Sequence, residues 1–332
     1  MIRIGIVGAG LIGGKRAEAI KKTGLGRVVA VADVDQKKAE ALASICGCSA
    51  EGDWRALVRR SDLDVVIVSV PNKFAMSISV SALKNGKHVL IEKPFGRNSK
   101  ESQKILSVAR HSGRLLMVGF NHRFHPGIMK AKEIFDKGII GKLLFIRSRY
   151  GHGGRMGMEK EWRFQKNISG GGELLDQGVH VIDLARWFAG DFKRVYGLVR
   201  TKFWKTKLED NAFALLENDS ATVSLHVSAT NWKNIFSFEI FGDKGFLSLD
   251  GKGGSYGEET LTLGIRPNKF GVPKTKIFRF SGDTSWENEW RNFVYAISRK
   301  KKIIGDGLDG LMANKIVEAV ERSSKSQKVV CL

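Results

Sequence analysis

An acid and an imidazole lie four residues apart where a glycine-rich stretch, 170–172, begins a helix predicted over residues 173–188. On such a helix Asp176 and His180 would share one face. This spacing suits a carboxylate that aligns an imidazole, or two groups that bind one polyol. The ordinary alternative is a buried helix histidine with an acid partner, so a functional interpretation needs further chemical groups near the pair.

Further polar groups follow three predicted strands in the first half of the chain. They are Pro71-Asn72 after strand 65–70, Glu92-Lys93-Pro94 after strand 88–91, and the segment 121–126 after strand 115–118. The carboxyl ends of parallel strands form the edge at which open α/β sheets bind ligands. A cis Lys93-Pro94 bond would direct the Lys93 side chain into the ligand cleft, and the sequence leaves both isomers open.

A glycine-rich turn follows the first predicted strand, 2–7. Gly8, Gly10 and Gly13 have the G-x-G-x-x-G spacing, which permits a tight turn, backbone approach to a pyrophosphate and close packing of helix on strand. Asp33 ends the second strand 20 residues after Gly13, where a carboxylate accepts hydrogen bonds from ribose hydroxyls. These residues predict a dinucleotide site, with Leu11 and Ile12 at the N-terminus of its helix.

The residue at position 33 also bears on the choice of cofactor. A carboxylate beside the ribose 2′ position would repel the extra phosphate of NADP, so Asp33 favours NAD. Lys37 and Lys38 are close enough in sequence to soften that repulsion, and NADP therefore stays possible.

The order of the predicted elements indicates an α/β protein with two domains. Residues 1–120 alternate continuous apolar strands (2–7, 27–33, 65–70, 88–91, 115–118) with helices (15–23, 36–45, 53–60, 73–85, 99–111), which predicts a doubly wound parallel sheet of the Rossmann type. Residues 121–332 contain predicted helices (126–137, 173–188, 286–298, 310–323) and strands (143–150, 195–203, 211–216, 221–228, 236–241, 246–249). Period-two alternation there predicts a large, mostly antiparallel, open-faced sheet, and the closing helices are expected to pack back on the first domain.

The composition excludes several classes of protein. The 332 residues carry a net charge of +21, spread over both halves with one basic run at 299–302, which we interpret as a solvated surface or as steering of a phosphorylated ligand. No nucleic-acid partner is predicted. No apolar stretch approaches the roughly 20 residues of a spanning helix, so no membrane segment is predicted either. Three cysteines without histidines at ligand spacing indicate no metal and a reducing cytoplasm.

These segments resemble the Gfo/Idh/MocA family of NAD(P)-dependent sugar oxidoreductases, in which a Rossmann domain precedes a mostly antiparallel α/β domain. The resemblance covers nearly the whole chain and rests on the residues 8–13, 92–94, 121–126 and 170–180. It implies that Lys93, Asp176 and His180 form the catalytic group. It also implies cofactor contacts at the strand ends, at Val70, Pro71, Asn72, Glu92, Lys93 and Asn121. Many members have a histidine shortly after the Pro-Asn pair, where this chain has Lys73 and Phe74.

The implied reaction moves a hydride between a nicotinamide and a secondary alcohol or ketone of a sugar, polyol or nucleotide-sugar. His180, whose unperturbed pKa is roughly 6.5, would be the base, and Lys93 would stabilise developing alkoxide. Asp176 would orient His180 or bind an adjacent hydroxyl. Further substrate contacts are expected from Arg123, Arg155, Trp162 and Arg163, and Arg155, Arg163 and Lys166 would suit an anionic group such as a nucleotide diphosphate.

Two other functions stay open on the same residues. A glycosidase that recycles its NAD is kept open by the glycine-rich segment 151–154, and a non-catalytic nucleotide sensor is opposed by the intact proton-transfer set. The resemblance further implies a homodimer or homotetramer formed through the exposed face of the second sheet. The alternating apolar residues Phe236, Phe238 and Ile240 agree with such an interface.

Overall fold

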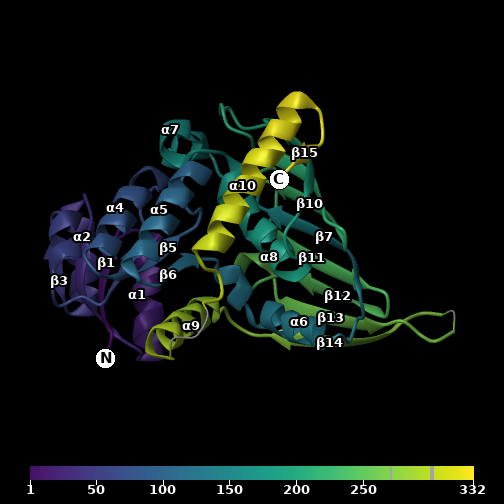
Figure 1. The fold of residues 1–332 in the computed structure, drawn as a ribbon, viewed down its shortest axis with the longest axis horizontal. Coiled ribbons are helices and arrows are strands. Elements are labelled where there is room, and N and C mark those ends of the chain that lie inside the picture. The colour runs from purple at the N-terminus through teal and green to yellow at the C-terminus, as the bar shows by residue number, and fades with distance from the viewer. Residues whose placement is uncertain (270, 300–302) are drawn as a thin grey trace. The chain divides into compact units, whose positions relative to one another are not determined.

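The computed structural model describes residues 1–269, 271–299 and 303–332. The chain divides into two compact units (Figure 1). Unit 1 comprises residues 1–121, 167–170 and 285–314, and unit 2 comprises residues 122–166, 171–284 and 315–332. Three residues of the basic run, Lys300 to Lys302, lie outside the described residues.

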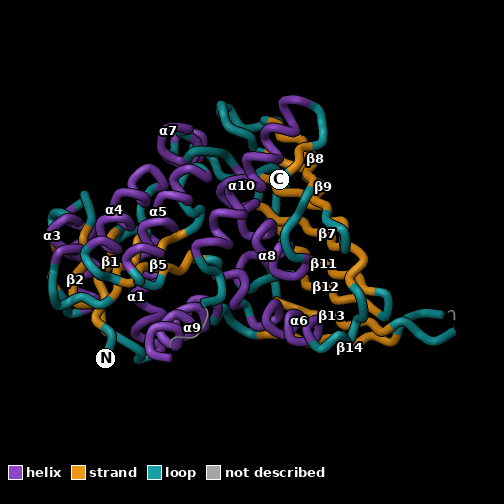
Figure 2. Tube along the Cα trace, viewed as in Figure 1, coloured by secondary structure: helices purple, strands orange, loops and turns teal. Residues whose placement is uncertain are grey.

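Unit 1 contains a six-stranded parallel sheet with the order β3-β2-β1-β4-β5-β6. Figure 2 shows strands of this sheet, among them β1, β2 and β5, in orange and the helices around them in purple. The strands are β1 (Arg3–Val7), β2 (Arg27–Ala32), β3 (Ser49–Glu51), β4 (Val65–Val68), β5 (His88–Glu92) and β6 (Leu116–Gly119). All four residues of β4 are buried, as expected for a parallel strand covered on both faces. The strand order reverses between β1 and β4, which is where doubly wound sheets bind their ligands.

The helices of unit 1 are α1 (Leu11–Thr23), α2 (Gln36–Cys46), α3 (Trp54–Arg59), α4 (Asn72–Lys84), α5 (Ser99–Ser112) and α9 (Ser285–Arg299). Three of them, α1, α2 and α5, end at a glycine with a left-handed backbone. Gly113 follows α5 at φ 63°, a left-handed C-cap that glycine adopts without strain. The ten strands and helices predicted for residues 1–120 are thus confirmed, and the three-residue edge strand β3 was not predicted.

A buried group of three charges ties together α1, β5 and α9. The Arg16 guanidinium, with a side chain only 2% exposed, donates to Glu92 Oε1 at 2.7 Å and also pairs with the fully buried Glu289. The guanidinium carbon lies 4.5 Å from the centre of the Trp286 ring. One cation therefore balances two carboxylates from different elements of the same unit.

Unit 2 is built on a nine-stranded sheet with the order β14-β13-β12-β11-β7-β10-β9-β8-β15. Its strands are β7 (Leu143–Gly151), β8 (Arg194–Arg200), β9 (Asn211–Glu217), β10 (Thr222–Ser228), β11 (Ile235–Gly242), β12 (Gly245–Asp250), β13 (Glu259–Ile265), β14 (Lys274–Phe280) and β15 (Val330–Cys331). The neighbours β7 and β10 run parallel, and the other neighbouring strands run antiparallel. The predicted mostly antiparallel sheet is confirmed, whereas β13, β14 and β15 were not predicted.

Helices cover one face of this sheet. They are α6 (Pro126–Asp136) over β12 to β14, α8 (Val179–Ala189) over β7 and β10, and the last part of α10 (Gly307–Ser326) over β8. The amide of Gly197 on β8 donates to Ser323 Oγ of α10 at 3.0 Å. The short helix α7 (Lys166–Ser169) contains the point in the sequence, between residues 166 and 167, where the chain passes from unit 2 to unit 1.

The expectation that Phe236, Phe238 and Ile240 lie on the exposed face is wrong. All three are buried on β11, at 3% exposure or less. Large apolar residues are exposed on another strand of the sheet, for example Phe213 and Leu215 of β9 at 46% and 49%. Alternation along β11 was recognised correctly, but the apolar side faces the helices.

We expect Arg16→Met to lower the free energy of unfolding by about 3–5 kcal/mol, because it leaves two carboxylates buried without their cation. Arg3→Met is the matched control, since the Arg3–Asp64 pair is more than one third exposed and water screens its charges, so its loss should be much smaller. Urea unfolding monitored by circular dichroism measures both. Equal losses in the two variants would contradict the stabilising role of the buried group.

Candidate functional site

The glycine turn between β1 and α1 depends on close backbone contacts. Gly8 has φ 102°, and a Cβ there would lie 2.2 Å from the carbonyl oxygen of Ser69. A Cβ at Gly13 would lie 2.0 Å from the carbonyl oxygen of Gly8. The Ser69 hydroxyl donates to that same Gly8 oxygen at 2.8 Å. A side chain at either glycine would therefore force the turn apart.

Asp33 closes this turn from the end of β2. Its Oδ2 accepts from the amide of Ala9 at 2.7 Å, and its Oδ1 accepts from the amide of Asp35 at 2.9 Å. A carboxylate has about four acceptor sites, so acceptor capacity remains for ribose hydroxyls. The predicted spacing of Asp33 and the glycines is thus realised as a physical contact.

The N-terminus of α1 is open to a ligand. Nothing lies within 4 Å of a Cβ placed on Gly10, no side chain caps the helix, and Leu11 is 78% exposed. The first amides of a helix lack partners within it and carry the positive end of its dipole. These residues fit a dinucleotide, whose pyrophosphate would approach Gly10 and whose ribose would meet Asp33.

Other predicted cofactor contacts make bonds within unit 1. The Asn72 amide donates to the carbonyl oxygen of Ser169 at 2.7 Å, and the Asn121 amide donates to Ser285 Oγ at 3.1 Å. Glu92 accepts from Arg16, as described above. Val70 and Pro71 connect β4 to α4. These bonds give the three polar side chains a structural role, and their cofactor contacts stay predictions.

Lys93 follows the last residue of β5 and is only partly exposed. The Lys93-Pro94 peptide bond is cis. Lys93 and the glycine turn thus belong to unit 1, whereas Asp176 and His180 belong to unit 2.

The helix that carries Asp176 and His180 begins irregularly. Residues Leu174–Gly178 form a π-helical turn, which leads directly into α8. Such turns are rare and are found frequently at functional sites. Asp176 lies in the wide turn, and His180 is the second residue of α8, so the predicted helix is present with an altered first part.

His180 is 4% exposed and stacks face to face on His122. The two ring centres are 3.8 Å apart, and the ring planes differ by 13°. Tyr150 of β7 meets the His122 ring edge-on at 5.0 Å, and its hydroxyl lies 3.5 Å from His122 Nε2. The predicted base is therefore part of a buried aromatic cluster.

Two tyrosines extend this cluster toward the chain segment that follows β12. Tyr150 and Tyr256 share a hydrogen bond between their hydroxyls. Burial raises the pKa of Tyr150 well above its usual value and that of Tyr256 to about 12. The Lys252 ammonium lies 4.0 Å from the centre of the Tyr256 ring. Both tyrosines are therefore protonated at neutral pH and keep a hydroxyl hydrogen.

The predicted basic contacts to substrate are balanced by acids. Arg163 Nε lies 3.5 Å from Asp176 Oδ2, and its guanidinium lies 4.7 Å from the centre of the Trp162 ring. Arg155 pairs with Glu161 at 2.7 Å. The arginines predicted to contact a substrate therefore lie in ion pairs, and their substrate contacts stay predictions.

Arg123 forms a buried ion pair with α8, and its predicted contact with a substrate stays a prediction. Its side chain is 3% exposed and donates two bonds to the Asp183 carboxylate of α8, at 2.7 and 2.6 Å. Such a buried bidentate pair holds the turn Asn121–Phe124 (η1) against α8. This geometry favours a structural role over contact with a substrate.

A carboxyl group supports the glycine-rich start of the helix. Glu209 Oε1 accepts from the amides of Gly172 and Leu174, at 3.0 and 3.2 Å. Burial raises the pKa of Glu209 to about 7. The π-helical turn is thus held at its beginning by an acceptor 37 residues further along the chain.

Several residues of these sites were not singled out from the sequence. Ser69 was assigned to a predicted strand. His122 lies between Asn121 and Arg123, which were predicted to contact the cofactor and the substrate, but no role was predicted for His122 itself. Tyr150 ended a predicted strand, and Tyr256 had no element assigned to it. For His122 and for Tyr150, the available signal was a position beside residues that the sequence had already indicated.

Residues 1–269, 271–299 and 303–332 contain no group of three or more His, Cys, Asp or Glu side chains that could hold a metal ion. Within the same ranges, no helix has the length and apolar character required to span a membrane.

Two family models match the chain. The model described as the oxidoreductase family with an NAD-binding Rossmann fold matches residues 2–120. The model described as the GFO/IDH/MocA C-terminal domain matches residues 128–248. The two matches thus cover the glycine turn, Asp33, Lys93, Asp176 and His180.

Several proteins with similar sequences are named as dehydrogenases. Levoglucosan dehydrogenase of Pseudarthrobacter phenanthrenivorans is 35% identical over 151 residues, which cover 45% of this chain and 39% of that enzyme. Inositol 2-dehydrogenase of Rhizobium meliloti is 27% identical over 345 residues, which cover 100% of this chain and 99% of the enzyme. D-glucoside 3-dehydrogenase of Escherichia coli is 26% identical, with 98% of this chain and 96% of the enzyme covered.

Solved structures agree on the fold. A levoglucosan dehydrogenase in complex with NADH and L-sorbose has a TM-score of 0.92 at 22% identity, with 100% of this chain and 98% of that chain covered. At this identity the likeness establishes the fold alone. Taken with the two family matches, it shows that the chain belongs to the Gfo/Idh/MocA family of oxidoreductases with an NAD-binding Rossmann fold.

Proposed function

We propose that the protein is an NAD(P)-dependent dehydrogenase that interconverts a secondary alcohol and a ketone of a sugar or polyol. The observation that carries this proposal is the glycine turn closed by Asp33, in a chain that also holds the Asp176–His180 helix. The names of the relatives, which act on levoglucosan, inositol and D-glucosides, support the same class of substrate.

In this proposal the chain's own residues move the proton and hold the alcohol. When bound, the nicotinamide supplies the acceptor for the hydride. The His180 imidazole accepts the proton of the reacting hydroxyl, which is the usual work of a general base near neutral pKa. The Lys93 ammonium donates to the same oxygen and stabilises its developing negative charge. Asp176, paired with Arg163, binds an adjacent hydroxyl or orients the base.

The ion pairs in the loop favour a neutral substrate. Arg155 and Arg163 are balanced by Glu161 and Asp176, so the loop offers less net positive charge than the sequence suggested. A free sugar or polyol is therefore preferred here over a nucleotide-sugar. The NAD-recycling glycosidase and the nucleotide sensor are not favoured, because the named relatives are dehydrogenases.

NAD is the proposed cofactor, with NADP as the weaker alternative. Both Asp33 oxygens accept backbone amides, which holds the carboxylate at the end of β2. A fixed negative charge there repels a 2′-phosphate. Lys38 is paired with Asp35 at 3.2 Å, so its charge is partly balanced.

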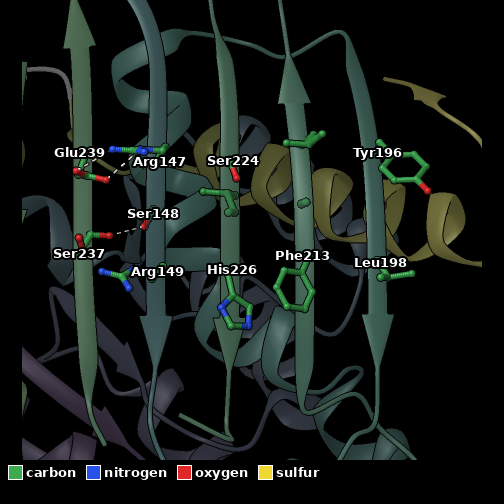
Figure 3. A pocket seen from close by; sticks show the side chains of 13 residues that line it. Arg147, Ser148, Arg149, Tyr196, Leu198, Phe213, Ser224, His226, Ser237 and Glu239 are labelled. Carbon is green, nitrogen blue, oxygen red and sulfur yellow. Dashed lines mark hydrogen bonds and ion pairs between the residues drawn. The ribbon is translucent and has the colours of Figure 1, made fainter.

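The uncovered face of the nine-stranded sheet is proposed as an interface between copies of this chain. Figure 3 shows Arg147, Arg149, His226 and Phe213 on neighbouring strands, with helices behind those strands. The side chains line a hollow of about 700 Å³. Exposed apolar rings in a sheet mark an interaction surface. Arg147 and Glu239, 3.1 Å apart, place both signs of charge on the face, which allows a two-fold contact to pair opposite charges from the two copies.

A reducing compartment, the cytoplasm, is the proposed location. Its support is that Cys46, Cys48 and Cys331 are free thiols.

The function is tested by measuring NAD and NADP reduction with polyols, free sugars, uronic acids and nucleotide-sugars. We expect turnover with a neutral sugar or polyol, and His180→Ala should lower kcat by about 100- to 10,000-fold because the proton loses its acceptor. NADH affinity, measured by fluorescence, should be unchanged. His111→Ala, an exposed histidine of α5, is the control. Full turnover in His180→Ala would refute the assignment of the base.

Asp33→Asn should shift the cofactor preference toward NADP, because it removes the charge while keeping an acceptor oxygen. We expect the ratio of kcat/KM for NAD to that for NADP to fall at least about tenfold, the effect of one pKa unit of charge interaction. Asp53→Asn removes a carboxylate that caps α3 and serves as control. An unchanged ratio would show that Asp33 does not meet the ribose.

Phe213→Asp should convert the oligomer to monomers, because it buries an unpaired charge in the proposed interface. Light scattering after size-exclusion chromatography measures the mass of each species. Val272→Asp changes an apolar residue that is 90% exposed outside this face, and it should leave assembly intact. A monomeric wild type, or an assembled Phe213→Asp variant, would rule out this interface.

A further inference from the structure

A second buried imidazole in unit 2 has no task in the mechanism proposed above. His122 lies in the turn Asn121–Phe124 and is 2% exposed. Its ring lies flat against that of His180, with centres 3.8 Å apart and planes within 13°. One face of the proposed base is therefore covered by a second imidazole that comes from 58 residues earlier in the chain.

The His122 ring is itself held by rings from three other places. Tyr150 of β7 meets it edge-on at 5.0 Å, and Phe236 of β11 does so at 5.6 Å and 87°. His125, which precedes α6, meets it at 5.6 Å and 79°. Edge-to-face contacts of this kind are favourable and directional. A ring that is held on its edges cannot turn easily, so the plane it offers to His180 is defined.

The geometry separates two ways in which His122 could act. Proton transfer between two imidazoles needs an N–H directed at a ring nitrogen, and rings stacked face to face point their nitrogens past one another. The stack therefore provides no direct proton path from His180 to His122. What it provides is a fixed ring plane, and with it a fixed direction for the nitrogen that must meet the substrate hydroxyl.

We propose that His122 is a positioning residue for His180, which it holds through ring stacking. The proposal rests on the proposed function, since it assumes that His180 is the base. It concerns the reacting geometry and not the affinity for substrate, because His122 is buried behind His180. The flat face of the His122 ring is what orients His180, so another flat ring at position 122 should preserve most of kcat.

Three variants test this proposal in the full chain. His122→Leu fills a similar volume without a flat face, and we expect it to lower kcat by about 10- to 100-fold with KM and NADH affinity changed less than about twofold. His122→Phe restores a flat ring and should recover kcat to within about fivefold of wild type. If the leucine variant does not fold, as judged by circular dichroism, His122→Gln replaces it as the variant without a ring.

A double variant shows whether the effect passes through His180. With His180→Ala as background, His122→Leu should cause no further loss of turnover, because the ring that it positions is gone. A further loss by the same factor would overturn the proposal, as would equal losses in the leucine and phenylalanine variants. An unchanged kcat in His122→Leu, with turnover lost in His180→Ala, would overturn this inference and leave the proposed function standing. Full turnover in His180→Ala would overturn both.

Discussion

The close approach of three backbone segments in unit 1 is the constraint on which the nucleotide site depends. Gly8, Gly13 and the end of β4 are so near one another that a Cβ at either glycine would lie about 2 Å from a carbonyl oxygen. This contact sets the entry of α1 onto the sheet, and it leaves the first amides of the helix open beside Gly10. Asp33 then completes the turn by accepting from Ala9. The acid that would select the cofactor and the turn that would hold its phosphates are thus one hydrogen-bonded structure.

In unit 2, the orientation of the proposed base depends on the packing of α8 against the covered face of the sheet. Tyr150 and Phe236 point inward from their strands and are buried, and the Tyr150 ring meets that of His180 on α8 edge-on at 6.2 Å. His180 enters this apolar layer from the helix, and His122 enters it from the turn before α6. A buried imidazole placed among rings has few orientations open to it. The same ring contacts therefore pack the core of unit 2 and fix the orientation of the His180 ring.

The sequence predicts the parts of the structure that depend on local pattern. Continuous apolar runs such as 65–68 identified the strands of unit 1, and the glycine spacing with Asp33 identified the turn. Period-two alternation at 236–240 showed a strand with two different faces, but alternation does not say which face meets the helices. Strand β14 escaped notice because Lys274, Lys276 and Arg279 interrupt its apolar residues, as suits an exposed edge. The His122–His180 stack joins residues 58 positions apart, and no local pattern encodes such a pair.

The basic surplus shows why counting charges does not identify a ligand. Arg16 and Arg123 are each committed to buried carboxylates, and Arg163 lies beside Asp176. A paired arginine has little net charge to offer an anion, yet its remaining N–H groups and the remaining acceptor sites of its partner can still form hydrogen bonds. A polyhydroxyl ligand needs alternating donors and acceptors, and has no charge to neutralise. The ion pair between Arg163 and Asp176 therefore argues against an anionic substrate. The same pair offers the donors and acceptors that a sugar or polyol needs.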